Sequence, residues 1–163
     1  MAAVARLYRT TSSGVALLAF GLVFCVSCRT ATPLPPADFS SPGWTLRQGQ
    51  GVWKPSRRRP ELAGDLLLAT NANGNYVVQF SKTPFTLAAA QVTDGGWQIE
   101  FGAGQYSWRG QGAPPARFVW FQLPRVLSGA PLADAWQLTR PAADSWRLEN
   151  SRTGEFLEGA FFP

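Results

Sequence analysis

The most reactive side chains lie at the start of the chain, because Cys25 and Cys28 are the only cysteines among its 163 residues. The chain contains no histidine that could activate either thiol. This composition excludes a Ser-His-Asp triad, a Cys-His pair and any histidine-ligated zinc, haem or non-haem iron. It also excludes a disulfide beyond residue 28.

The carboxylates and lysines do not form a catalytic pattern either. Asp94, Asp134 and Asp144 lie beside turn residues, where an Asp side chain bonds to the local backbone. Lys54 and Lys82 are the only lysines, and neither has the serine three positions earlier that a Ser-x-x-Lys nucleophile needs. We therefore expect no catalytic residue, no metal ion and no cofactor.

The first 28 residues have the organisation of an export signal. Arg6 and Arg9 give a basic start, and residues 14–26 form an uninterrupted apolar run of 13 residues. A membrane-spanning helix needs about 20 apolar residues, whereas the core of a signal peptide needs about 7–15. Ser27 and Cys28 follow the run, and a small residue before a cysteine resembles the lipobox of bacterial lipoproteins.

This resemblance implies cleavage after residue 27 and a thioether-linked diacylglycerol on Cys28, with a further acyl chain such as palmitate on its amine. Several acyl chains together anchor a protein stably to a membrane. Residue 29 is Arg rather than the Asp that retains some lipoproteins in the inner membrane, which favours the outer membrane and a periplasm-facing domain. The alternative is an ordinary secretory leader with Cys28 merely near the cut.

The mature chain would carry little net charge. Without Arg6 and Arg9 it has 13 basic and 10 acidic residues, which leaves 13 minus 10, or +3. Nucleic acid is therefore not an expected partner in the envelope. The three arginines at 57–59 are interpreted as a solvated loop, with contact to anionic lipid headgroups as the alternative.

Composition also divides the rest of the chain. Residues 28–43 contain four prolines and are typical of a tether, and residues 44–163 then form a single β-rich domain. Short apolar stretches alternate with turn residues there. They predict strands at 44–54, 61–70, 75–80, 85–93, 97–101 and 106–109, and two or three more among 136–139, 146–149 and 155–161.

Residues 116–129 are the ambiguous segment of this domain. Their apolar positions favour a kinked or two-part helix, in which Pro124 opens the second turn and Gly129 ends it. A strand followed by one helical turn is the alternative. The predicted fold is mainly β: a strongly curved antiparallel sheet, as an open or half β-barrel, with a short helical lid segment.

Seven tryptophans and eleven phenylalanines dominate the apolar positions. One interpretation is that they form a filled core. A second is that part of the inner sheet face lines an open apolar cavity, and a third is an exposed platform on which sugars stack.

Three stretches, at residues 79–87, 120–131 and 144–149, resemble segments of the LolB/LolA-like fold of the bacterial lipoprotein-localisation pathway. The resemblance extends over about residues 44–163. It implies an unclosed β-barrel whose concave apolar face accepts acyl chains beneath a helical lid.

We therefore expect an anchored, non-enzymatic envelope lipoprotein that binds acyl chains or a lipidated partner in the concave sheet face. The candidate lining residues alternate along two predicted strands and are Tyr76, Val78, Phe80, Trp97, Ile99 and Phe101. One alternative is a structural or scaffolding lipoprotein with a filled core and no small ligand. Another is a carbohydrate-binding module.

Overall fold

Nine antiparallel strands form one continuous sheet in the computed structural model, which describes residues 32–142 and 144–163. The order in space is β6-β5-β4-β3-β2-β1-β9-β8-β7. The elements are β1 (Trp44–Lys54), β2 (Leu62–Asn71), β3 (Tyr76–Lys82), β4 (Phe85–Thr93), β5 (Gly96–Phe101), β6 (Tyr106–Gly110), α2 (Val119–Leu127), β7 (Trp136–Thr139), β8 (Ser145–Asn150) and β9 (Phe156–Phe161).

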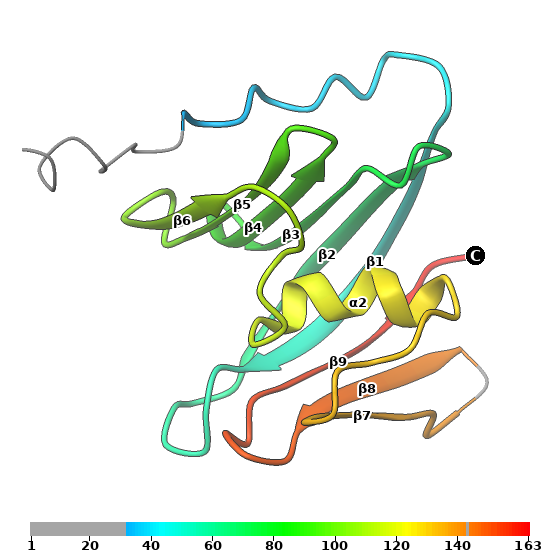
Figure 1. Cartoon of the computed structure of the whole chain (residues 1–163). Coiled ribbons are helices and arrows are strands. Elements are labelled where there is room, and N and C mark those ends of the chain that lie inside the picture. Colours follow the sequence, from blue (N-terminus) through cyan, green and yellow to red (C-terminus); the bar gives the residue numbers. More distant parts are fainter. Residues whose placement is uncertain (1–31, 143) are drawn as a thin grey trace, which may run out of the picture. The chain divides into compact units, whose positions relative to one another are not determined.

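The sheet is curved but open. Strands β1 to β6 pair with their chain neighbours as a meander, and β9 returns to pair with the free side of β1. Strands β6 and β7 are the two edges, and α2 lies in the hollow between the two ends of the sheet (Figure 1). The predicted fold class, a curved antiparallel sheet with one short helix, is confirmed.

The ambiguous segment contains a single helix. Residues Val119–Leu127 are continuous α-helix with Pro124 inside it. The favoured prediction of a helix is therefore confirmed, while its two-part form and the alternative of a strand followed by one helical turn are wrong. Burial explains why the helix continues through Pro124. Every helix residue up to Leu123 is buried, and this tertiary packing offsets the loss of the hydrogen bond that proline cannot donate.

The end of the helix is the one predicted. Gly129 adopts a φ of 78°, which glycine reaches without the steric cost of a side chain. The amide of Ala130 donates to the carbonyl of Arg125 at 2.8 Å, and the amide of Gly129 donates to Val126 at 3.1 Å. These two bonds satisfy carbonyls that the last helical turn leaves free.

Glycines allow the backbones of β2, β1 and β9 to approach one another closely. Gly64, Gly51 and Gly159 occupy directly opposed positions in these three strands. A Cβ atom on Gly51 would lie 2.7 Å from the carbonyl oxygen of Glu158, and one on Gly159 would collide with the carbonyl oxygen of Gln50. The backbones therefore approach too closely for any side chain in this row.

Residues 33–43 of the predicted tether belong to the folded unit, which comprises Pro33–Pro163. The amide of Leu34 donates to Oε1 of Gln98 at 3.0 Å, and Nε2 of Gln91 donates to the carbonyl of Pro35 at 2.9 Å. Both glutamines lie on the outer face of the sheet. Residues 34 and 35 are thus bound to β4 and β5.

We predict that Gly159→Ala lowers the free energy of unfolding by about 1–3 kcal/mol, because the added methyl group must displace strand backbone. Denaturant unfolding followed by circular dichroism measures the change. Gly95→Ala is the matched control, since its Cβ would meet only Thr93 Oγ1 at 3.6 Å. Equal stability of the two variants would contradict the close approach of β1 and β9.

Candidate functional site

The six predicted lining residues come together on the inner face of the sheet. The register of β3, β4 and β5 places them in three cross-strand rows: Tyr76, Val92 and Trp97; Val78, Ala90 and Ile99; and Phe80, Ala88 and Phe101. The alanines of β4 are the small members of two of these rows. They leave room above the sheet for large side chains from another element.

Helix α2 supplies those side chains. Val119, Trp120, Phe121 and Leu123 are all fully buried against the inner face. The ring centroid of Trp120 lies 5.5 Å from that of Phe80 and 5.1 Å from that of Trp53. The centre of the concave face is therefore filled by the protein's own helix.

The lining candidates differ in their exposure as a result. Val78, Phe80 and Ile99 are fully buried beneath α2. Tyr76, Trp97 and Phe101 are half-buried at the margins of the helix, where Trp97 meets Phe121 with centroids 5.8 Å apart. Cys28, the predicted lipidation site, lies outside the described residues.

An open cleft of about 360 Å³ lies between the C-terminal end of α2 and strands β1 to β3. Its apolar lining comes from Leu68, Pro124 and Leu127, and its polar lining includes Arg47, Arg125 and Tyr76. The lining contains no carboxylate. Burial raises the pKa of the Tyr76 hydroxyl, and the positive charge of Arg125 partly opposes this, so the phenol stays protonated at neutral pH.

Both arginines of this cleft are held by contacts within the domain. Arg125 donates from Nη2 to the carbonyl of Pro131 at 2.8 Å and from Nε at 3.2 Å. The guanidinium of Arg47 lies 4.4 Å from the ring centroid of Phe161, a cation–π contact. The cleft combines an apolar wall with two fixed positive charges, which suits the anionic end of an amphiphile.

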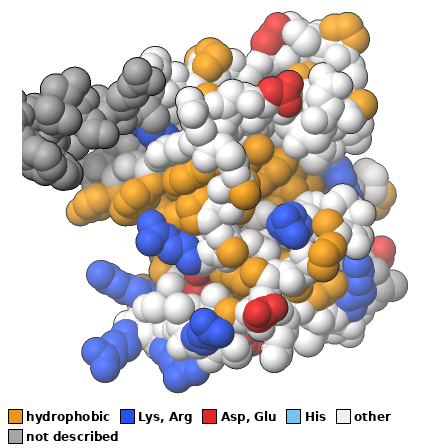
Figure 2. Space-filling view, in the orientation of Figure 1, with side chains coloured by type: hydrophobic (Ala, Val, Ile, Leu, Met, Phe, Trp, Pro, Cys, Tyr) orange, Lys and Arg blue, Asp and Glu red, His pale blue; other side chains and the backbone are white. Residues whose placement is uncertain are grey.

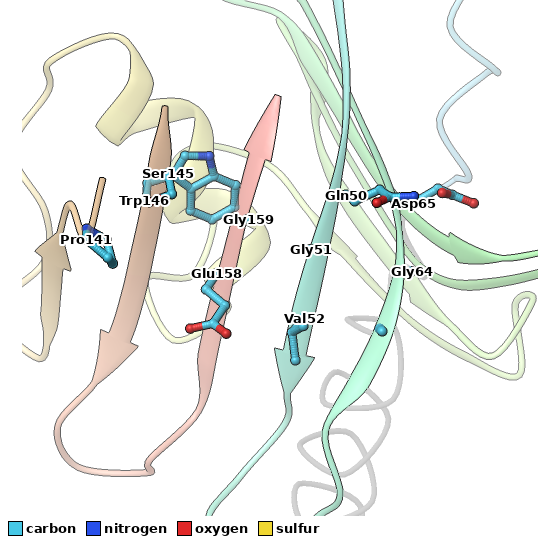
Figure 3. Close-up of a pocket in the computed structure, with 11 residues that line it drawn as sticks. Gln50, Gly51, Val52, Gly64, Asp65, Pro141, Ser145, Trp146, Glu158 and Gly159 are labelled. Atoms are coloured by element: carbon cyan, nitrogen blue, oxygen red, sulfur yellow. The ribbon is translucent and has the colours of Figure 1, made fainter. Parts of the chain in front are cut away.

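A larger groove of about 640 Å³ crosses β2, β1, β9 and β8 (Figure 3). Gln50, Asp65 and Glu158 contribute polar side chains to it, with Gly51 and Gly159 between them. Glu158 is already engaged by Nη1 of Arg147 at 2.6 Å. The groove therefore has a mixed lining with one of its carboxylates neutralised.

The tryptophans do not form a sugar-stacking platform. All seven lie in the described part of the chain, and Trp108 alone among them is exposed, at 41%. It contacts Phe101 and Phe118, with centroids 5.9 and 5.8 Å apart. A row of exposed indoles beside polar groups, which the carbohydrate alternative requires, is not found there.

Sequence reasoning missed one unusual carboxyl group. Oε1 of Glu155 accepts a hydrogen bond from Nε1 of Trp53 at 3.2 Å. Burial raises the pKa of Glu155 to about 7, against the opposing effect of the Trp53 bond. A glutamate next to a turn is typical of solvated surface, and its contact with a residue 102 positions away left no local signal.

In residues 32–142 and 144–163, no group of three or more His, Cys, Asp or Glu side chains is placed to hold a metal ion. No helix in this part of the chain is long and apolar enough to cross a membrane.

The raised pKa of Glu155 predicts that the stability of the domain depends on pH in an unusual way. Its pKa is about 7 when folded and 4.5 when unfolded, so the folded state keeps a proton that the unfolded state loses between these values. The free energy of unfolding should fall by about 3 kcal/mol as the pH rises from 4.5 to 7, then level off. Urea unfolding over this range measures it.

Glu155→Gln should remove that slope, because the amide stays neutral and its oxygen can still accept the Trp53 hydrogen bond. Asp134→Asn, a change at an exposed carboxylate, should leave the slope in place. Parallel pH profiles for the Glu155→Gln variant and the unmodified chain would refute the assignment.

No known family model matches this chain, and no curated protein matches it significantly. The similarity to the LolB/LolA-like fold therefore stays a prediction.

Proposed function

We propose that this chain is a lipid-anchored protein of the bacterial cell envelope, facing the periplasm, whose domain acts as a structural or docking module without catalysis. The observation that carries the proposal is the filling of the concave face by α2. Trp120 and Phe121 are fully buried in the space that an acyl chain would occupy. A filled core supports a scaffolding role over a ligand-binding cavity.

The membrane part of the proposal is supported by the leader. A basic start, a 13-residue apolar run and Ser27 before Cys28 favour cleavage and acylation at that cysteine. Arg29 after the cysteine favours the outer membrane. Each methylene of an acyl chain contributes about 0.8 kcal/mol on burial, so several chains hold the domain at the bilayer.

The filled core predicts that Trp120→Ala lowers the free energy of unfolding by about 3–5 kcal/mol, since a large buried side chain leaves a cavity. Trp108→Ala is the matched control and should cost about 1 kcal/mol or less, because this indole is exposed. Denaturant unfolding measures both. If α2 were a lid that opens separately, Trp120→Ala would cost no more than Trp108→Ala.

Intact mass spectrometry of the membrane-extracted protein tests the anchor. We expect a chain that begins at Cys28 and carries a diacylglycerol and an amide-linked acyl chain. Cys28→Ala should abolish this modification and remove the chain from the washed membrane fraction, whereas Cys25→Ala should leave both unchanged. An uncleaved, unmodified chain in the cytosol would refute the proposal.

Binding of an acyl chain or a lipidated partner is the second candidate, favoured by the cleft beside Tyr76. Its apolar wall and its two arginines, Arg47 and Arg125, match the chemistry of an anionic amphiphile. Native mass spectrometry separates the candidates. A lipid bound in addition to the one attached at Cys28, and lost in Arg47→Gln with Arg125→Gln, would support this second function over scaffolding.

A further inference from the structure

The edge strand β6 presents aromatic side chains to solvent. Tyr106 is 63% exposed and Trp108 is 41% exposed. Tyr106 pairs with Phe101 and Trp108 pairs with Ile99, so both side chains lie on the inner face of the sheet. Helix α2 does not cover them there. Phe118 extends the patch, with its centroid 5.8 Å from that of Trp108. We name Tyr106, Trp108 and Phe118, with Arg117, the β6 rim.

The β6 rim combines aromatic groups with positive charge. The guanidinium of the exposed Arg117 lies 4.6 Å from the ring centroid of Phe118. Arg109 lies on the other side of β6 and donates to Ser107 at 3.2 Å. The nearby carboxylate, Glu100, accepts a hydrogen bond from Gln98 on the outer face. Figure 2 shows the hydrophobic band over β5 and β6, with basic side chains next to it.

The length of chain between Cys28 and the part bound to β5 is short. Leu34 is hydrogen-bonded to Gln98 of β5, and Gln98 is the register partner of Arg109 in β6. Only six residue steps separate Cys28 from Leu34, and a fully extended chain covers about 3.3–3.6 Å per residue. The chain between Cys28 and Leu34 can therefore span about 22 Å at most.

We propose that the β6 rim is a second membrane contact, which rests in the headgroup region of an anionic bilayer. This inference depends on the lipid anchor proposed above. Trp and Tyr favour membrane interfaces because their rings are apolar at one end and polar at the other. Arg117 faces the phosphate groups, and the short link to Cys28 keeps the rim within reach of them.

Fluorescence quenching in the lipidated full-length protein tests this contact. Ser107→Cys provides a labelling site on β6, since Cys28 is blocked by its thioether. The label is an environment-sensitive nitrobenzoxadiazole, and the vesicles contain phosphatidylethanolamine, 30% phosphatidylglycerol and a headgroup-level quencher lipid. Thr45→Cys, at an exposed position on β1, is the matched control. We expect at least twofold stronger quenching at position 107 than at position 45.

We expect the quenching at position 107 to depend both on the side chains of the β6 rim and on the charge of the lipid. Tyr106→Ser combined with Trp108→Ser should reduce quenching at position 107 to the control level, while Leu46→Ser, at another exposed apolar position, should not. Arg117→Gln, or vesicles of phosphatidylcholine alone, should reduce it at least partly. Circular dichroism and flotation with the vesicles establish that each variant is folded and anchored.

Two results would overturn the inference while the anchor stands. One is equal quenching at positions 107 and 45 in a chain that floats with the vesicles. The other is a position-107 signal that depends on protein concentration and not on lipid charge, which would show that β6 pairs with a second copy. A chain without acylation at Cys28 that does not float would overturn the anchor and this inference together.

Discussion

The contact of Trp120 with the inner face of the sheet is the interaction on which the rest of the structure depends. Its indole meets Trp53 from β1 and Phe80 from β3, with centroids 5.1 and 5.5 Å away. These strands lie on two sides of β2 in the sheet. One side chain of α2 thus contacts both β1 and β3. This contact holds the curvature of the sheet, which the backbone hydrogen bonds between the strands alone would not fix.

The close approach of β2, β1 and β9 and the filling of the inner face of the sheet by α2 both depend on small residues. The glycine row of β2, β1 and β9 allows the backbones to approach closely. Ala88 and Ala90 of β4 leave space over the sheet for Phe121 and its neighbours. Larger residues at either place would push the sheet and the helix apart, because protein interiors are close-packed and tolerate little added volume. Small residues therefore shape this interior as much as the aromatic ones do.

Much of the β architecture was predictable, because alternation is a local property. Trp97, Ile99 and Phe101 alternate with polar residues in β5, and the glycines after Asp94 form the turn before it. The position of α2 over the inner face was not predictable from alternation. Alternation shows that Val78 and Ile99 point to one side, but it does not show that α2, from another part of the chain, covers them.

The return of β9 to β1 has a consequence for how the protein reaches its native state. Gly51 pairs with Gly159, which follows it by 108 positions, whereas the pairs within the meander are local. As the chain folds, β1 to β6 can assemble while one side of β1 still has unsatisfied amide and carbonyl groups. Such an edge is a template for pairing with another chain. The interval before β9 pairs with β1 is therefore the period in which newly made molecules are most prone to aggregate.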